Sequence, residues 1–411
     1  MEKKEVLELK RRLKKESCTI SKLAGCYVNA AKEKVCMFQE DFLSLEEEEF
    51  FKYLEIANKT LSGTVGNNLI QLSFPNEEEM EGGAQHSLLG LKNSKLEVPE
   101  VNEAFFDSVI KSYDYVGNYL ILLFYDVYDV PTKTTDNMKL DESEEVYDYI
   151  LCAVCPVKLT KAALGYREEE NRIAPRIRDW AVDAPDSGFL FPAFSDRSTD
   201  IHNVMMYTKN TKDPHKEFWE NGLGCASKFT STEKKNAFEH MIVNAVGPEN
   251  EELEDIIADV NQNISDFIDS VKEVRGDKEP VVLNKKDVEE ILSDAGLSDQ
   301  KAEHVAKTYE EFFPAEELPL ADEVLDTKVI KNNEIRQEKN ALKEQVVTLT
   351  QKLEQAGVIN ENGENVDVIL RVSEKKAEEI HTTVIDGQKC IVIPMEEDEY
   401  ATINGEVKDL D

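Results

Sequence analysis

The sequence predicts an α+β protein, with a sheet-and-helix part first, helices in the middle and a small β-rich unit at the end. Two long apolar segments, residues 118–130 and 145–159, are rich in β-branched and aromatic side chains, as buried central strands are. Between residues 233 and 356 most apolar side chains instead recur at helical spacing. Asp386-Gly387, between two β-branched runs, then predicts a two-residue hairpin turn.

The chain length predicts more than one domain, because 411 residues exceed what a single hydrophobic core normally supports. We expect an N-terminal α+β domain over residues 1–247 and a helical region over residues 248–330. A heptad helix over residues 331–357 and a small β-α-β-β unit over residues 358–411 are expected to follow.

The composition predicts a cytoplasmic protein without a membrane segment. The 84 acidic and 48 basic side chains give a formal charge of −36, which repels phosphate backbones and anionic lipid surfaces. Nucleic-acid binding by the body of the protein is therefore disfavoured.

The longest apolar run, Tyr119–Tyr125, is far shorter than the ~20 residues that span a bilayer, and no signal-peptide pattern is seen. Seven scattered cysteines do not resemble a disulfide framework, which indicates a reducing compartment.

A basic amphipathic helix is predicted over residues 3–15. Val6, Leu9 and Leu13 recur at helical spacing, and Leu7 widens the apolar stripe. Lysine and arginine outnumber acidic residues on its other faces, a pattern typical of helices at membrane surfaces or nucleic acids. The alternative is that this positive helix packs on the acidic body of its own chain.

A second helix is predicted to begin at Ser44, with Ser44 as N-cap and Glu47 as its capping-box partner, and to end at Gly63. Its expected buried face consists of Phe50, Phe51, Leu54, Ala57 and Leu61. Further predicted elements are strands over 19–29, 33–39, 67–74, 201–209 and 366–372, helices over 85–95, 100–113 and 373–380, and a short hairpin over 164–177.

The helical middle contains recognisable start and stop signals. One helix is predicted over residues 233–246 and another over residues 249–274. Asn284 is expected to cap a third helix that ends at Gly296, and Ser298 to cap a fourth. Because the fourth helix mixes acidic and basic residues, we interpret the last two as a plain helical hairpin and not as a DNA reader.

Residues 332–356 form a heptad pattern of a little over three repeats. One seam position holds Ile335, Leu342, Leu349 and Ala356, and the other holds Asn332, Lys339, Val346 and Leu353. This length is near the minimum for a coiled coil. Self-association through this helix and packing against its own chain both remain open.

Cys152 and Cys155 form a C-x-x-C motif. A zinc site needs a second pair of ligands at suitable spacing, and the other cysteines do not supply one. The motif also lies in an apolar strand, where positions three apart point to opposite faces. We therefore interpret both cysteines as small buried apolar residues.

Residues 178–210 hold the polar side chains that most resemble a catalytic site. The candidates are Asp196, Arg197, Asp200 and His202, with Arg176 and Arg178 as further groups for a phosphate or carboxylate. A strand through residues 199–203 would bring Asp200 and His202 to one face, as a metal or acid–base site requires. A metal- or phosphate-dependent hydrolase is therefore one hypothesis.

The same segment is also explained as a structural or partner-binding loop. Asp183 and Asp186 are turn formers, and Arg–Asp pairs commonly tie loops to a core. Phe189, Phe191 and Phe194 are expected to anchor this loop.

Several stretches of the sequence together carry a resemblance to a known family. Among them are "CTISKLAGCYVNAAKEK", "NYLILLFYDVYDVP", "IRDWAVDAPDSGFLFPAFSDRSTDIHN" and "IDGQKCIVIPM". In these the chain resembles a bacterial family known as domain of unknown function 4317, over nearly its whole length. The resemblance implies no activity, cofactor or site, because the family has none assigned.

Our leading hypothesis is a cytoplasmic, non-enzymatic binding or scaffold protein that acts through protein partners. One alternative is the hydrolase that uses residues 178–210. Another is a nucleic-acid-associated protein that uses the basic first helix, since the order of elements is similar to that of bacterial nucleoid-associated proteins. The sequence indicates no particular metal or cofactor and leaves open whether the chain is an enzyme.

Overall fold

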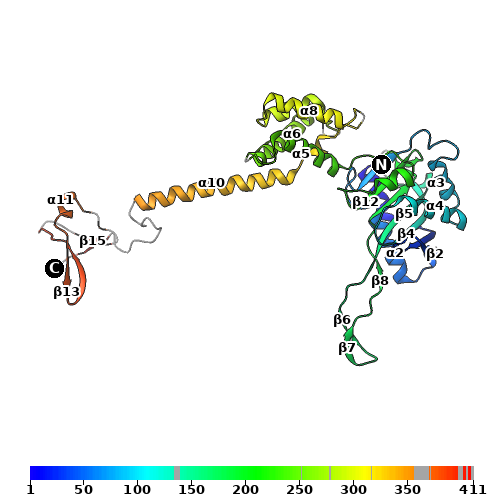
Figure 1. Cartoon of the computed structure of the whole chain (residues 1–411), viewed down its shortest axis with the longest axis horizontal. Helices are drawn as coiled ribbons and strands as arrows, with labels where there is room; N and C mark the ends of the chain where they lie inside the picture. The colour runs from blue at the N-terminus through cyan, green and yellow to red at the C-terminus, as the bar shows by residue number, and fades with distance from the viewer. Residues whose placement is uncertain are drawn as a thin grey trace. The chain divides into compact units, whose positions relative to one another are not determined.

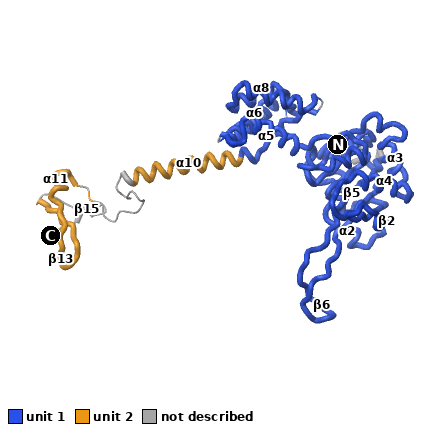
Figure 2. Tube along the Cα trace, viewed as in Figure 1, with its two compact units in different colours: residues 1–330 blue, residues 331–411 orange. Residues whose placement is uncertain are grey.

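The computed structural model describes residues 1–133, 139–250, 252–276, 279–315, 317–355, 370, 372–396, 401–403 and 406–408. The chain divides into two compact units, residues 1–330 and residues 331–411 (Figure 2). An N-terminal sheet, a helical middle and small C-terminal strands confirm the predicted α+β class.

An antiparallel sheet of eight strands forms the framework of the first unit (Figure 1). Its strands are β1 (Lys22–Val28), β2 (Lys34–Asp41), β3 (Leu69–Ser73), β4 (Asn118–Lys133), β5 (Lys139–Leu159), β8 (Trp180–Val182), β9 (Ser187–Phe191) and β12 (Asn203–Thr208). The strand order is β2-β1-β4-β5-β9-β12-β3, and β8 pairs with β5. The two long apolar segments, β4 and β5, are therefore central strands, as predicted.

Helices cover both faces of the sheet, and for this reason β4 and β5 are apolar at nearly every position. One face packs against α1 (Lys3–Arg12) and α2 (Glu47–Thr60). The other packs against α3 (Ala84–Asn93), α4 (Pro99–Ser112) and the π-helix η2 (Phe218–Gly222). Successive residues of β4 alternate between these two cores: Leu122 belongs to the first and Ile121 to the second.

Cys152 and Cys155 lie on opposite faces of β5, in different cores, as the strand period predicts. Both thiols are free and fully buried. Burial raises the pKa of Cys155 to about 12 and that of Cys152 well above its ordinary value. The interpretation as small buried apolar residues is confirmed.

α1 packs on the sheet through Val6 and Leu9, as predicted. Leu7 does not widen this stripe, because its side chain is exposed. Helix α1 ends at Arg12, and Leu13 is buried directly after it.

The predicted N-cap at Ser44 is wrong. Ser44 ends a short 3-10 helix, η1 (Phe42–Ser44), and α2 begins at Glu47 with Glu46 as its N-cap residue. The buried Phe42 ring packs edge-on against Phe124 of β4 at a centroid distance of 5.9 Å. This contact with the sheet accompanies the short 3-10 helix. The spacing of residues in the sequence does not reveal such a contact.

The predicted buried face of α2 is correct at three of its positions. Leu54 and Ala57 are buried within the helix, and Leu61 is buried at its C-cap. Phe50 is only partly buried, and Phe51 is exposed. The stripe that faces the sheet is therefore narrower than predicted.

The helices after the sheet share a separate core: α5 (Ser231–Val246), α6 (Leu253–Arg275), α7 (Lys285–Asp294), α8 (Asp299–Phe312) and α9 (Ala321–Val324). α5 packs in this core through Phe238 and Ile242, so it groups with the helices that follow and not with the sheet. Asn284 caps α7 as predicted, because its side-chain oxygen accepts hydrogen bonds from the N–H groups of Lys286 and Asp287.

Two further hairpins complete the first unit. The short hairpin predicted over residues 164–177 is formed by β6 (Leu164–Arg167) and β7 (Arg172–Pro175), which lie on a two-stranded arm extending from the sheet (Figure 1). The second hairpin joins β10 (Ala193–Ser195) to β11 (Ser198–Asp200).

The second unit contains most of the long helix α10 (Thr327–Gln355), the short helix α11 (Glu374–Ala377) and two hairpins, β13 (His381–Ile385) with β14 (Gln388–Val392) and β15 (Ala401–Ile403) with β16 (Glu406–Lys408). Asp386 and Gly387 both have positive φ, which confirms the predicted turn. The strand predicted over residues 366–372 lies almost wholly outside the described residues.

Among the helices of the described ranges, none combines the length and the apolar character that a bilayer crossing requires.

Candidate functional site

Three strands of the sheet, β8, β9 and β12, run through residues 178–210, so this segment is not a single loop. β9 lies between β5 and β12, and all five of its residues are buried. Phe189 and Phe191 of this strand fill the core under α3 and α4, whereas Phe194 fills the opposite core. The phenylalanines are thus anchors, as predicted, but Phe189 and Phe191 anchor a central strand, and Phe194 anchors the β10–β11 hairpin.

Asp196 and Arg197 form the two-residue turn between β10 and β11. Their φ values are 50° and 60°, and Ser195 pairs with Ser198 on either side. This geometry is that of a type I′ turn, which favours short polar residues at its first central position. Local turn chemistry therefore accounts for the aspartate at 196.

Arg197 binds α1. Its Nη2 lies 2.9 Å from Oε1 of Glu8, and its Nε lies 3.2 Å from Oε2, which makes a two-point ion pair. Both side chains are mostly buried. The arginine therefore ties the β10–β11 turn to the N-terminal helix.

Asp200 and His202 do not lie on one strand, because β11 ends at Asp200 and residues 201–202 form a turn. The carboxylate of Asp200 accepts hydrogen bonds from the N–H of His202 at 3.1 Å and from Nδ2 of Asn203 at 2.7 Å. Nδ1 of His202 lies 2.8 Å from Oε1 of Glu79, and this hydrogen bond raises the pKa of His202. The premise of a shared strand face is wrong.

The side chains of Arg197, His202 and Asp200 therefore bind different partners: Arg197 binds Glu8 of α1, His202 binds Glu79, and Asp200 accepts from the backbone of the following turn. Within the described ranges, no group of three or more His, Cys, Asp or Glu side chains could hold a metal ion. The two other arginines lie in the arm: the N–H of Arg176 donates to the carbonyl oxygen of Ala163, and at the base Nε of Arg178 donates to that of Thr160 at 2.7 Å.

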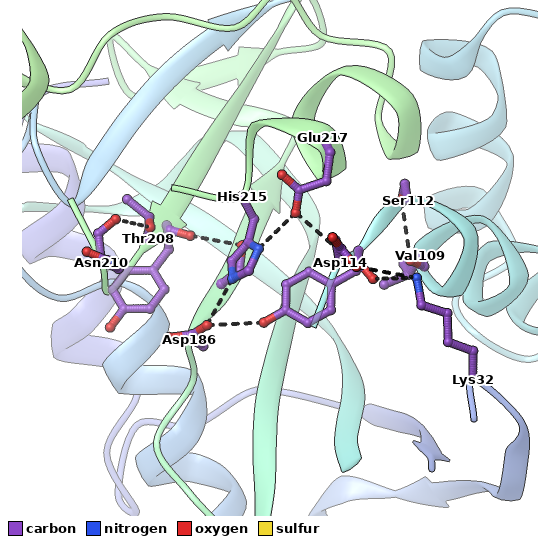
Figure 3. Close-up of polar contacts among 12 residues, drawn as sticks. Lys32, Val109, Ser112, Asp114, Asp186, Thr208, Asn210, His215 and Glu217 are labelled. Carbon is purple, nitrogen blue, oxygen red and sulfur yellow. Dashed lines mark hydrogen bonds and ion pairs between the residues drawn. The ribbon is translucent and has the colours of Figure 1, made fainter. Parts of the chain in front are cut away.

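A second polar cluster was not predicted from the sequence. Figure 3 shows His215 between the carboxylates of Asp186 and Glu217. Nε2 of His215 lies 3.0 Å from Asp186, and Nδ1 lies 2.8 Å from Glu217. The hydroxyl of Tyr113 donates to Asp186 at 3.2 Å. We call these four residues the His215 cluster.

The His215 cluster joins three segments that are distant in the sequence. Tyr113 follows α4, Asp186 precedes β9, and His215 and Glu217 lead into η2. The N–H of Asp114 also donates to Glu217 at 3.3 Å. The ring of Tyr113 lies 4.4 Å from that of His215. The cluster therefore fastens one end of the sheet to the helices on one face.

The imidazole of His215 is expected to be charged. Ionised carboxylates only accept hydrogen bonds, so two of them engage both ring nitrogens only when each nitrogen carries a proton. Burial alone lowers the pKa of His215, but the hydrogen bonds with Asp186 and Glu217 outweigh burial and raise it. The hydrogen bond from His215 lowers the pKa of Asp186 against the opposing effect of burial.

A histidine held in this way is a fixed cation and not a free general base, because neither nitrogen has a lone pair to offer. A sequence signal existed in "DAPDSG" and "DPHKE", which place acids beside turns and beside a histidine. Neither string reveals that the two segments meet.

The arm, residues 160–179, has an apolar face. Leu164 pairs with Pro175 and Tyr166 pairs with Ile173, so these four side chains share one side of the ribbon. Arg167 pairs with Arg172 on the opposite side. At the base of the arm, Trp180 of β8 is also exposed.

Comparison with curated proteins returns no match. The family described as Domain of unknown function (DUF4317) matches residues 1–406. The match covers nearly the whole chain, including the sheet, the arm and α10, and so the chain belongs to this family.

Proposed function

We propose that this chain is a non-enzymatic binding protein of the cytoplasm that acts through protein partners, and that the arm contacts them. The observation that carries the proposal is the apolar face of the arm, where Leu164, Tyr166 and Ile173 are 73, 60 and 63% exposed. Contiguous exposed apolar side chains of this kind mark interaction sites in soluble proteins.

A two-stranded ribbon has no second layer to cover its apolar face, and such ribbons are marginally stable alone. A partner surface would supply that layer. The tyrosine suits this role, because its ring buries a large apolar area while its hydroxyl remains hydrogen-bonded, here to Oδ1 of Asn171 at 2.7 Å.

The acidic tip of the arm and the net charge of the whole chain favour a protein over a nucleic acid. Three successive glutamates, 168–170, form its tip. Glu170 pairs with the side chains of both Arg167 and Arg172 and partly offsets their positive charge. The carboxylates and the chain's charge of −36 both repel phosphate groups.

Basic side chains in and just after helix α1 also make contacts within the same chain. Nη2 of Arg12 lies 3.5 Å from Asp126, and its guanidinium lies 3.9 Å from the centre of the Tyr128 ring. Lys15, just after the helix, pairs with Glu47. These contacts support the interpretation that α1 packs on its own acidic body.

The arm variant Tyr166→Asp/Ile173→Asp is expected to lose partner binding, because two charges replace the centre of the apolar face. The matched control is Leu43→Asp/Met80→Asp, since these side chains are 62 and 63% exposed elsewhere on the same unit. Tagged full-length chains are recovered from the host, and co-purifying protein is quantified by native mass spectrometry. We expect at least roughly tenfold less partner with the arm variant and no change with the control.

A partner retained equally by both variants would show that the arm is not the contact. Recovery of the chain with a stoichiometric metal ion or nucleotide and no protein would instead favour the hydrolase hypothesis. In that case Asp200→Ala and His202→Ala, tested in a phosphoesterase assay, decide whether residues 196–202 are responsible.

A further inference from the structure

We propose that helix α10 pairs with the same helix of a second copy of this chain, as a parallel, in-register, two-stranded coiled coil. The inference goes beyond the proposed function and rests on residues of the second unit, not on the arm.

The observation that points to a partner is an exposed apolar stripe along α10. Ile335, Leu342, Val346 and Leu349 are 63, 61, 61 and 58% exposed, and Leu353 is 43% exposed. They follow the three- and four-residue spacing of a coiled-coil seam. Ala356, the last predicted seam residue, lies outside the described residues. A helix of 29 residues with this stripe has an apolar face that the described part of its own chain does not cover.

Val346 and its two leucine neighbours favour two strands. In heptad notation Val346 occupies an a position, between Leu342 and Leu349 at d positions. A β-branched residue at a with leucine at d is the combination that favours two-stranded coiled coils. Ile335, one heptad before Leu342, continues the d positions toward the start of the helix.

The asparagine at the seam favours the parallel, in-register arrangement. Asn332 and Lys339 both occupy a positions in the first half of the pattern. In the parallel pair Asn332 faces Asn332 of the partner subunit, and the two amides can hydrogen-bond to each other. In the same arrangement Lys339 faces Lys339 of the partner subunit, and this pair of like charges lowers the stability of the dimer. Polar residues at a are known to fix register and oligomeric state in this way.

One pair of flanking charges agrees with the same register. Glu338 at g lies five residues before Lys343 at e, so in a parallel pair Glu338 faces Lys343 of the partner subunit. The twofold symmetry of the dimer makes this attractive contact twice. One heptad earlier, Lys331 and Arg336 are like charges, so the attraction is confined to the middle of the helix.

The first test compares two neighbouring valines of the full-length chain. Wild type is expected to sediment as a dimer of the 46.7 kDa chain. Val346→Lys places a charge at the seam and is expected to raise the dissociation constant roughly tenfold or more. Val347→Lys is the control, because Val347 is 56% exposed but lies off the seam. Far-UV circular dichroism checks that both variants keep their helix.

The second test addresses orientation. Glu338→Lys and Lys343→Glu are each expected to weaken the dimer by roughly threefold, and the double exchange to restore it. Leu353→Cys is expected to form a disulfide-linked dimer on oxidation, beyond the background of the wild-type cysteines. In an antiparallel pair the two copies of residue 353 would be about 27 Å apart, because residue 353 would face residue 335, 18 residues away at 1.5 Å each.

A monomeric wild type would overturn the proposal, as would equal loss of dimer in Val346→Lys and Val347→Lys. If the Leu353→Cys chain formed a disulfide with an Ile335→Cys chain but not with a second copy of itself, the parallel arrangement would be wrong. The arm variant Tyr166→Asp/Ile173→Asp is expected to remain dimeric, so this proposal and the proposed function fail independently.

Discussion

Replacing Asp126 with leucine is expected to lower the free energy of unfolding by about 3–5 kcal/mol, the usual cost of removing one partner of a buried pair. Asp126 is 1% exposed. Its Oδ2 accepts a hydrogen bond from the hydroxyl of Tyr149 at 2.6 Å, and its Oδ1 accepts one from Thr19 at 2.6 Å. Arg12 of α1 lies 3.5 Å away. The leucine would leave a buried hydroxyl and a mostly buried guanidinium without their acceptor.

Urea unfolding followed by circular dichroism measures this change, and the control lies three residues along the same strand. Asp129 is exposed, so Asp129→Leu is expected to change the free energy of unfolding by less than about 0.5 kcal/mol. Equal effects of the two substitutions would show that the buried contacts of Asp126 contribute little.

Replacing His215 with glutamine is expected to lower the free energy of unfolding by about 2 kcal/mol near pH 6, because a charged group that binds two carboxylates is lost. The substitution also leaves Asp186 without the hydrogen bond that lowers its pKa. The segment that leads into η2 is then held less firmly to the end of the sheet.

The stabilising effect of His215 is expected to decrease as the pH rises. The pKa of His215 is raised on folding, so its contribution is fully present below the ordinary imidazole pKa of about 6.5. The contribution is lost as the pH rises through the higher value of the folded state. Asp186 has a lowered pKa, so its contribution is present above about pH 4 and is lost as the pH falls through its folded-state value.

The free energy of unfolding of wild type and His215→Gln is measured near pH 6 and near pH 9, and the difference between them should be smaller at the higher pH. His202→Gln is the matched control. The pKa of His202 is also raised by a carboxylate, but its side chain is 65% exposed and solvent weakens the pair. A pH-independent effect of His215→Gln would contradict a charged imidazole in the cluster.

Features with local causes were predicted from the sequence. The apolar runs of β4 and β5 indicate central strands, because only strands covered on both faces are apolar throughout. Asn284 caps α7, and Asp386-Gly387 turns between β13 and β14. In each case the residues that determine the geometry lie within a few positions of one another.

The candidate site was predicted less well, because its contacts join distant segments. Asp196 and Arg197 were recognised by residue type, but the partner of Arg197 is Glu8, 189 residues away. The segment that contains them was interpreted as a loop, since short strands broken by turn formers resemble one. Pairing with β5 and with β12 makes β9 a strand, and no periodicity within five residues could show that.

The sequence by itself determined the α+β class, the central strands, the cap of α7 at Asn284 and the apolar stripe of α10. Only the tertiary structure brought His215 between Asp186 and Glu217, buried Asp126 beneath Arg12, and left one face of the arm uncovered. The physical reason is the range of the interactions. Periodicity and turn chemistry act between neighbours in the chain, whereas a charge acquires its partner, and an apolar face its cover, only when the strands are ordered in the sheet.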